Sequence, residues 1–543
     1  MDDFFQANVK DPASQYSVRV PSMNGLSYNS SQEIIIYIDP SVRVFDPLET
    51  YLKFRVKINS AMKTKLYLDP KMGGQCLIRD VNIRSGTGVL LEELFSYNQF
   101  VHLKYSYDNR ACLKNKRVLL EGSTDTSDRN KPPLNGTGGS YLTSLYGNDV
   151  FNSAWGDDEE AELCLPLHTG IFSNDKIFPN HLTDGLYIHM LLETDQNCIR
   201  QNPKVVNPEF ALKFLCDGTQ DPTTGGAGWP QTNSTSDFFI QCNVNLNTAD
   251  LNNFPFQKGE KFAFFEAASP HDIIVNNPVR TFEIDEFDID GDFIKITISG
   301  ADYQPGDAGA EVPSGSLLLS VESAQAGAVA PKYQITQADL IVGAIEPPDS
   351  FYNSIQSRLL DPETGLITYD FESVQTYSQT VLASNTAGTL LMPLNNTMCK
   401  SLLCKAHDTA QLDWKEALNN NFYKGVYDKL LQYQFFYKNT YQPDRPVRTS
   451  VIMDNAVAQQ QLIELEKALY MADISPENFN EFKDNFVIGR AVALNKQIAD
   501  LNNTDVQLNV NYDNTASINK LFRIFVAHIR AIEFRSGGIS IQV

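Results

Sequence analysis

The sequence lacks the signals that would place it in a membrane or directly on nucleic acid. No apolar run approaches the roughly 18–20 residues that a membrane-spanning helix needs. Lys and Arg total 44 against 66 Asp and Glu, so the formal net charge is −22. Direct binding of nucleic acid requires many cationic contacts with phosphates. A chain this acidic is therefore a poor direct partner for nucleic acid, although it can enclose DNA if another protein neutralises the phosphates.

Secretion signals and paired cysteines are also missing. Residues 1–5 carry acid where a signal peptide carries base, and no apolar segment follows them, so we expect synthesis and folding in the cytosol. Buried free thiols are the expected state of the scattered cysteines. Cys399 and Cys404 are five residues apart in a strand-like segment, which places them on opposite faces and argues against a shared metal or disulfide. The eight cysteines are Cys76, Cys112, Cys164, Cys198, Cys216, Cys242, Cys399 and Cys404.

Motifs of catalysis are absent as well. The sequence has no G-x-x-x-x-G-K-[ST] loop, no G-x-S-x-G elbow and no H-x-x-x-H pair. We interpret the histidines of the central stretch as core or interface residues; they are His168, His181 and His189. The acidic run at 157–160 is interpreted as a solvated loop. We predict no catalytic residue, no metal ligand and no cofactor-binding residue.

One segment, Asp288–Asp292, is similar to a calcium-binding loop. An EF-hand loop has glycine at its sixth position and glutamate at its twelfth. Here the glycine, Gly291, is fourth and Ser299 is twelfth. The flanking runs, Phe282–Phe287 and Phe293–Ile298, read as strands, so a hairpin with a tight turn at Asp290-Gly291 explains the segment better.

What the sequence does contain is alternation of apolar and polar residues with a period of two. This pattern is typical of half-buried strands, and turn sequences separate the runs. No rhythm of alternating strands and helices is present, which disfavours a parallel α/β sheet. We therefore predict a mainly β protein of antiparallel sandwiches or jelly rolls. The clearest runs are Thr50–Ile58, Leu163–Leu167, Leu186–Leu192, Phe238–Leu246 and Val506–Tyr512.

Helices are expected in few places. Helical spacing predicts one from Leu90 to about Tyr105, and a second over about 455–471 with Asp454 as its N-cap. A third is predicted to begin at Ser475, with proline at its first position, and to continue through Phe486 and Arg490.

Three linker-like segments divide the chain. They are rich in Gly, Pro, Ser or Ala, and they cover Gly122–Gly139, Asp217–Ser236 and Ala301–Pro331. We interpret residues 205–332 as a large insertion into a first domain. The second half resumes after Pro347-Pro348. With 543 residues, the chain has room for about three domains.

An ordered set of segments resembles the double jelly-roll major capsid proteins of the virophage and polinton-like virus type, in the adenovirus hexon-like lineage of double-stranded DNA viruses. The likeness covers nearly the whole chain except 205–332. The segments that carry it are Ile78–Glu93 as strand, turn and helix, Leu163–Phe172 leading to Lys176–Met190, Gly365–Asp370 after Pro347-Pro348, and Phe486–Arg490, Leu521–Val526 and Ile539–Val543 at the end of the second barrel.

This resemblance implies a domain plan. It gives two antiparallel eight-stranded jelly-roll barrels in tandem with a β-rich insertion and a few short helices. Residues 1–20 would form an N-terminal arm under the capsomer. The first barrel would span 21–346 and carry the insertion, about 205–332, as an outward tower. The second would span 347–543, with a helical insertion over about 454–490.

The resemblance also implies a structural function. Three chains would form a homotrimeric, pseudo-hexameric capsomer, and capsomers would tile an icosahedral shell around a double-stranded DNA genome. Partners would be copies of itself, pentons, and minor or cement capsid proteins, without sequence-specific binding of nucleic acid. The location would be the virion capsid, assembled inside the host cell in the cytoplasm or a viral factory. Whether an inner membrane exists stays open.

Alternatives remain at this stage. One is a non-viral β-sandwich protein that binds carbohydrate, and another is a β-rich glycoside hydrolase, which would need two carboxylates about 5–10 Å apart in a cleft. A minor capsid protein such as a penton would need one jelly roll, and strand patterning in both halves of the chain favours two.

Overall fold

The structure is a computed structural model of the full chain. It describes residues 14–59, 66–69, 71–108, 110–123, 160–201, 332–361, 365–396, 398–409, 422–449, 459–476, 485–492 and 498–542, together with the strands of a separate sheet between 210 and 320. Strands dominate this part of the chain, which confirms the predicted mainly β class.

The first barrel is a sandwich of two antiparallel sheets with jelly-roll order. Its first and last strands are neighbours in one sheet, and the chain crosses repeatedly between the two sheets, as in a jelly roll. The first sheet has the order β1 (Ser14–Pro21), β18 (Lys332–Glu346), β4 (Val44–Asn59), β8 (Ala161–Pro166), with β2 (Tyr28–Asn29) beside β18. The second has the order β3 (Glu33–Ile38), β9 (Leu186–Leu192), β6 (Ile78–Ser85), β7 (Leu90–Leu94). A short pair, β5 (Leu66–Tyr67) and β10 (Arg200–Gln201), lies beside them.

The second barrel repeats this order strand for strand. Each of the eight main strands of the first barrel therefore has a counterpart in the second. One sheet runs β19 (Leu366–Val381), β26 (Lys520–Arg535), β21 (Cys399–Asp408), β24 (Val487–Ala491), with β27 (Gly538–Gln542) also on β26. The other runs β20 (Ala387–Leu394), β25 (Thr504–Tyr512), β22 (Leu430–Tyr437), β23 (Thr440–Arg448). The predicted tandem of two eight-stranded jelly rolls is confirmed.

Alternation along the strands builds the core of each barrel. Leu186, Ile188, Met190 and Leu192 on β9 are all fully buried, while the residues between them are partly exposed. In the second barrel, Val506, Leu508 and Val510 do the same on β25. One face of each strand thus packs against the opposite sheet, as the period of two predicted.

Helices lie in the connections between strands. They are α1 (Tyr97–Tyr107), α2 (Ala111–Glu121), α4 (Asp195–Cys198), α6 (Asp349–Leu359) and α8 (Gln459–Met471), with single turns η1 (Gly74–Leu77) and η2 (Asn180–Leu182). In both barrels the connection between the fifth and sixth of the eight strands carries helix: α1 and α2 lie between β7 and β8, and α8 lies between β23 and β24. Among the described residues, no helix is long and apolar enough to cross a membrane.

Two helix predictions need correction. The helix predicted from Leu90 starts only at Tyr97, because Leu90–Leu94 pairs with β6 as strand β7. The third predicted helix does not reach Phe486 or Arg490, because β24 pairs with β21 there. Long-range strand pairing outweighs the local helical spacing in both places. The helix at about 455–471 is confirmed from Gln459 onward, and its predicted N-cap lies outside the described residues.

The segment between β10 and β18 contains a sheet of its own. Its order is β14 (Ser269–Ile273), β13 (Lys261–Glu266), β15 (Phe282–Asp290), β16 (Phe293–Ile298), β12 (Asp237–Cys242), β11 (Phe210–Phe214), β17 (Leu317–Ser320). Asp290 lies opposite Phe293 in the antiparallel pair β15–β16, which confirms the hairpin that we preferred to a calcium loop. Gly291 and the acidic run at 157–159 lie outside the described residues.

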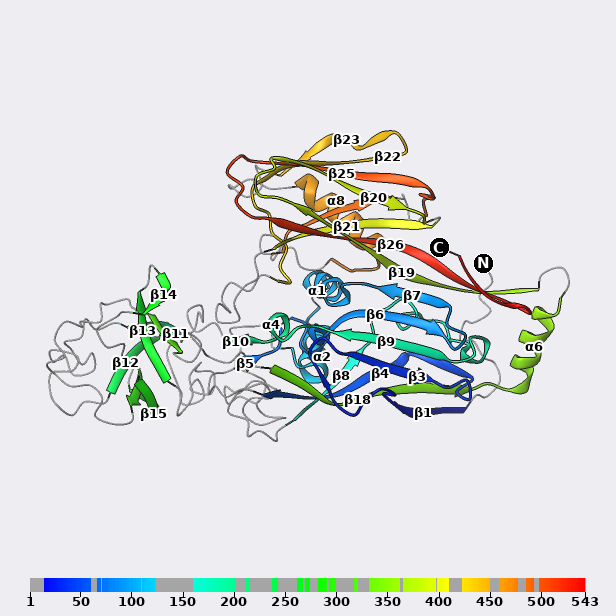
Figure 1. The fold of residues 1–543 in the computed structure, drawn as a ribbon, viewed down its shortest axis with the longest axis horizontal. Helices are drawn as coiled ribbons and strands as arrows, with labels where there is room; N and C mark the ends of the chain where they lie inside the picture. The colour runs from blue at the N-terminus through cyan, green and yellow to red at the C-terminus, as the bar shows by residue number, and fades with distance from the viewer. Residues whose placement is uncertain are drawn as a thin grey trace.

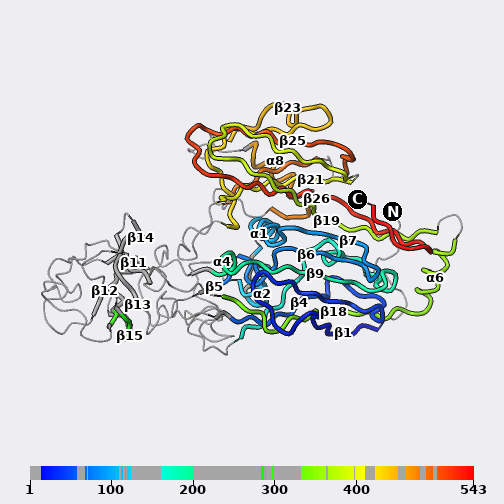
Figure 2. Tube along the Cα trace, in the orientation of Figure 1, coloured from blue at the N-terminus to red at the C-terminus, as the bar shows by residue number. Residues whose placement is uncertain are grey.

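The two barrels lie side by side with their strands running in roughly the same direction (Figure 1). The strands up to β9 together with β18, blue to cyan and green, and the strands from β19 on, yellow-green to red, form separate layers that touch along their length (Figure 2). The insertion sheet lies beyond one end of the barrels, and α6, which links them, lies at the opposite end. Residues 14–20, which we assigned to an arm, belong to strand β1.

Candidate functional site: the contact between the two barrels

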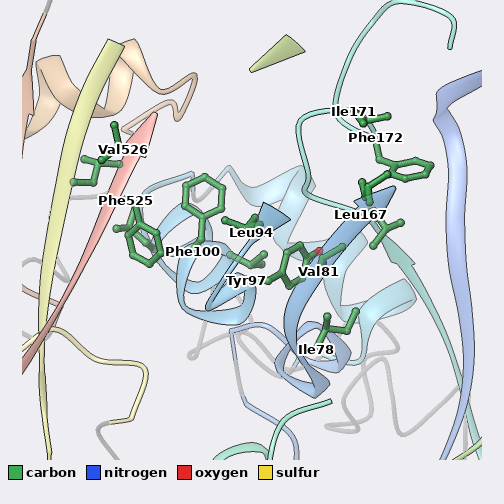
Figure 3. Packing of buried hydrophobic residues seen from close by; sticks show 14 of the residues in the cluster. Ile78, Val81, Leu94, Tyr97, Phe100, Leu167, Ile171, Phe172, Phe525 and Val526 are labelled. Carbon is green, nitrogen blue, oxygen red and sulfur yellow. The ribbon is translucent and has the colours of Figure 1, made fainter. Parts of the chain in front are cut away.

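The most elaborate arrangement of polar and aromatic residues lies where the barrels meet. The outer face of the sheet with β19, β26 and β21 rests on α1, β7 and the loop at 168–178 of the first barrel. Phe100 of α1 and Phe525 of β26 contact each other across the boundary, with ring centroids 5.6 Å apart (Figure 3). Phe178 meets Tyr369 edge to face at 5.2 Å. Burial of such rings is a large source of stability at a permanent contact.

Glu92 of β7 accepts hydrogen bonds from two other segments at the same contact. Its Oε1 accepts the backbone N–H of Gly170 at 2.6 Å and the hydroxyl of Ser373 at 3.1 Å, and its Oε2 accepts the N–H of Ile171 at 3.0 Å. Ser373 belongs to β19 of the second barrel. Burial raises the pKa of Glu92, while these hydrogen bonds and the nearby Arg530 oppose the rise. One buried carboxylate thus holds both barrels.

The backbones of the two barrels approach closely at Gly170. A Cβ atom at this position would lie 1.8 Å from the carbonyl oxygen of Glu372 on β19. Only glycine leaves room for that approach. Nearby, Lys176 forms an ion pair with Asp370 at 2.7 Å, and Tyr369 donates to the backbone oxygen of Lys176 at 3.2 Å. Steric fit and charge therefore fix the same register.

Helix α1 makes hydrogen bonds with loops of the second barrel. The amide of Gln99 donates to the backbone oxygen of Phe422 at 2.9 Å. The hydroxyl of Tyr107 donates to the backbone oxygen of Asn485 at 3.1 Å, and Asn98 donates to the hydroxyl of Tyr423 at 3.3 Å. These bonds satisfy polar groups that the contact removes from water.

A buried basic cluster lies at the same boundary. The ammonium group of Lys405 on β21 is 3.1 Å from Nδ1 of His102 on α1, and neither side chain is appreciably exposed. Burial lowers the pKa of Lys405 well below its usual range, and Lys71 nearby lowers it further, while Asp69 opposes this. Burial and Lys405 likewise lower the pKa of His102. In the part of the chain that the structure describes, no carboxylate forms an ion pair with Lys405.

A second buried network supports the contact from inside the first barrel. Tyr105 of α1 donates to Glu121 of α2 at 2.8 Å, and Nε2 of His168 lies 2.6 Å from the same hydroxyl. The guanidinium of Arg117 lies 3.5 Å from the centre of the Tyr105 ring. Burial raises the pKa of Glu121 to about 7, although the hydrogen bond from Tyr105 and the charge of Arg117 oppose the rise. The network connects α1, α2 and the segment after β8, and so holds α1 in place at the contact between the barrels.

The residues singled out in the sequence do not gather into a site. His168, His181 and His189 each lie beside a protein partner, which are Tyr105, the backbone oxygen of Arg43 and Glu33. None of the six cysteines whose side chains the structure describes forms a disulfide, and four of them are buried. Cys399 and Cys404 are both in strand β21, as predicted. Among the described residues, no group of His, Cys, Asp and Glu could hold a metal ion.

Sequence reasoning missed Glu92, Gly170 and Lys405. Glu92 stands in a Leu-Leu-Glu-Glu-Leu segment in which its neighbour Glu93 is equally acidic. The signal available was a carboxylate on the buried face of a strand, which becomes visible only when Leu90–Leu94 is read as strand. Lys405 lies on the outer face of β21, where residues of the first barrel bury it, so the pattern of its own strand does not mark it.

Comparisons with known proteins agree with this fold. No family model and no curated protein matches the sequence. Among solved structures, the Faustovirus major capsid protein has a TM-score of 0.50 at 8% identity, covering 97% of this chain and 91% of that chain. A chain of the Sputnik virophage structure gives 0.48 at 10% identity, covering 98% and 88%. The mavirus major capsid protein gives 0.38 at 11% identity, covering 99% and 92%. The chain therefore shares the double jelly-roll fold with the Faustovirus major capsid protein.

Proposed function

We propose that this protein is a major capsid protein whose homotrimers form the pseudo-hexameric capsomers of an icosahedral shell around double-stranded DNA. The observation that carries the proposal is the buried contact that joins two complete jelly rolls. Two barrels held in one orientation by Glu92, Gly170 and the Phe100–Phe525 pair form a rigid block. Three such blocks give six barrels, which is the number a hexagonal tile needs.

The role proposed is structural rather than catalytic. The position of the insertion sheet beyond one end of the barrels, opposite α6, supports an outward tower and an inward end that carries the start of β1. Other copies of the chain, pentons, and minor or cement proteins would be its partners in the virion. Its net charge of −22 favours a container over a direct nucleic-acid binder.

The native mass and outline of the purified protein test this proposal. Light scattering combined with negative-stain imaging should give a species near three times 60.8 kDa with a hexagonal outline. A protein that stays monomeric at every concentration and salt tested, and that binds or cleaves a glycan, would overturn the proposal in favour of a carbohydrate-binding protein or a hydrolase.

A further inference from the structure

The contact between copies can be inferred from the contact inside the chain. Because both barrels have the same strand order, β7 of the first corresponds to β23 of the second, and β1 corresponds to β19. Inside the chain, β7 meets β19. Ser373 of β19 donates to Glu92 of β7, and Thr376 of β19 donates to the backbone oxygen of Phe95 just after β7, at 2.8 Å. Both strands are buried or half-buried over this contact.

The counterparts of these two strands are uncovered. In the part of the chain that the structure describes, β23 pairs only with β22, and β1 pairs only with β18, so each is an edge strand. Val447 is the single buried residue of β23, and no residue of β1 is buried. Tyr441 on β23 is 54% exposed and Tyr16 on β1 is 46% exposed. The two strands lie on opposite outer sides of the pair of barrels, β23 above and β1 below in Figure 1.

Exposed aromatic residues lie on or beside both strands. Tyr441 lies beside Phe436 of β22, with ring centroids 5.0 Å apart. On the other side of the molecule, the strand register aligns Arg19 of β1 with Ile341 of β18 and Tyr51 of β4, and Tyr51 is 37% exposed. Edge strands with exposed aromatic residues promote association unless another chain covers them.

We infer that β23 of one copy packs against β1, and against the outward row beside it, of a second copy of this chain. The contact repeats between chains what β7 and β19 do within one chain. It joins two different surfaces, so it is heterologous, and it closes into a ring when its rotation permits. When the contact within a chain alternates with the contact between chains around a ring of six barrels, the ring contains three chains. The inference rests on the proposed function and names the surfaces by which the trimer forms.

Surface substitutions at the contact test the inference. Tyr441→Glu places a charge in the proposed contact, and we expect at least a 10-fold weaker trimer by light scattering across a concentration series. Leu391→Glu is the matched control. Leu391 is 41% exposed on β20, at the opposite edge of the same sheet, where the inference places no second copy. Thermal unfolding of both variants should stay near that of the unchanged protein, because exposed positions contribute little to folding stability.

Chemical cross-linking gives an independent measurement. Protein with Tyr441→Cys is mixed with protein with Ser17→Cys, and a short thiol cross-linker is added. Ser17 is exposed on β1. We expect covalent dimers in the mixture and far fewer with either variant alone or with the unchanged chain, whose exposed Cys112 sets the background.

The outcomes separate the inference from the proposed function. A trimer that resists Tyr441→Glu and gives no cross-link above background overturns the inference and leaves the capsid role standing. A trimer broken by Leu391→Glu but not by Tyr441→Glu also overturns it. An unchanged protein that never trimerises contradicts the proposed function itself.

Discussion

Removing the carboxylate of Glu92 should loosen the two barrels from each other. In Glu92→Ala, the backbone N–H groups of Gly170 and Ile171 lose their acceptor; Ile171 is buried and Gly170 is half-buried. Ser373 also loses its partner, but its hydroxyl can rotate toward another acceptor. The damage is therefore confined to the boundary between the barrels, and neither sandwich core loses an apolar side chain.

The expected loss follows from the two orphaned amides. A buried donor without an acceptor costs about 1–3 kcal/mol, so two donors, one of them half-buried, cost at most about 6 kcal/mol. Burial raises the pKa of Glu92, which means that the ionised carboxylate is itself costly to bury. Its removal returns part of that cost. We therefore expect a decrease of about 2–4 kcal/mol in the free energy of unfolding.

Urea unfolding followed by far-ultraviolet circular dichroism measures this free energy. Hydrogen exchange of the peptide that contains Gly170 and Ile171 shows whether the loss is local. Glu93→Ala is the matched control, because Glu93 is the half-buried neighbour on the other side of β7, and we expect a change within about 0.5 kcal/mol. If Glu92→Ala unfolds within about 0.5 kcal/mol of the unchanged protein and the peptide stays protected, the carboxylate does not hold the barrels together.

Four further changes probe the buried groups of the barrels and the contact between them. Burial raises the pKa of Glu121 from 4.5 to about 7. The free energy of unfolding therefore falls by about 3 kcal/mol as pH rises through this interval. Glu121→Gln should abolish that decrease in urea titrations at several pH values. Burial lowers the pKa of His528 from 6.5 to about 4. The free energy of unfolding therefore falls by about 3 kcal/mol as pH decreases through that interval, and His528→Gln should flatten its dependence on pH there. For Glu121 or His528, a variant with an unchanged slope would contradict the assigned titration. Lys405→Met replaces a buried amine with an apolar chain of similar length and should raise the melting temperature. The increase should be clearest at acidic pH, because burial and the adjacent Lys71 lower the pKa of this lysine. A lower melting temperature would contradict that reasoning. Gly170→Ala places a Cβ 1.8 Å from a backbone oxygen of the second barrel and should cost about 3 kcal/mol, whereas Gly537→Ala, with nothing within 4 Å, should be neutral by thermal unfolding.

The sequence predicted the architecture better than the contact between the barrels. Alternation in Leu186–Leu192 and Val506–Tyr512 is a property of one strand, so it can be read without knowing the partners of that strand. Glu92 and Lys405 act through residues distant in the chain, and no local pattern marks them. The same limit explains the helix wrongly extended back to Leu90, where pairing with β6 decides the conformation. The contact between the barrels depends on how distant segments align with each other, which the periodicity of a single strand does not encode.

The place of β18 has a consequence for how the protein is made. This strand lies between β1 and β4 in its sheet, and it ends at Glu346, whereas β1 ends at Pro21. At a synthesis rate of about 5–20 residues per second, β1 waits roughly 15–65 s for its partner. The ribosome must synthesise the whole insertion before β18 can complete the first-barrel sheet that contains β1 and β4. Both strands flanking the gap expose unpaired backbone during this time, so nascent chains on one polysome are most prone to aggregate before the second barrel has begun to emerge.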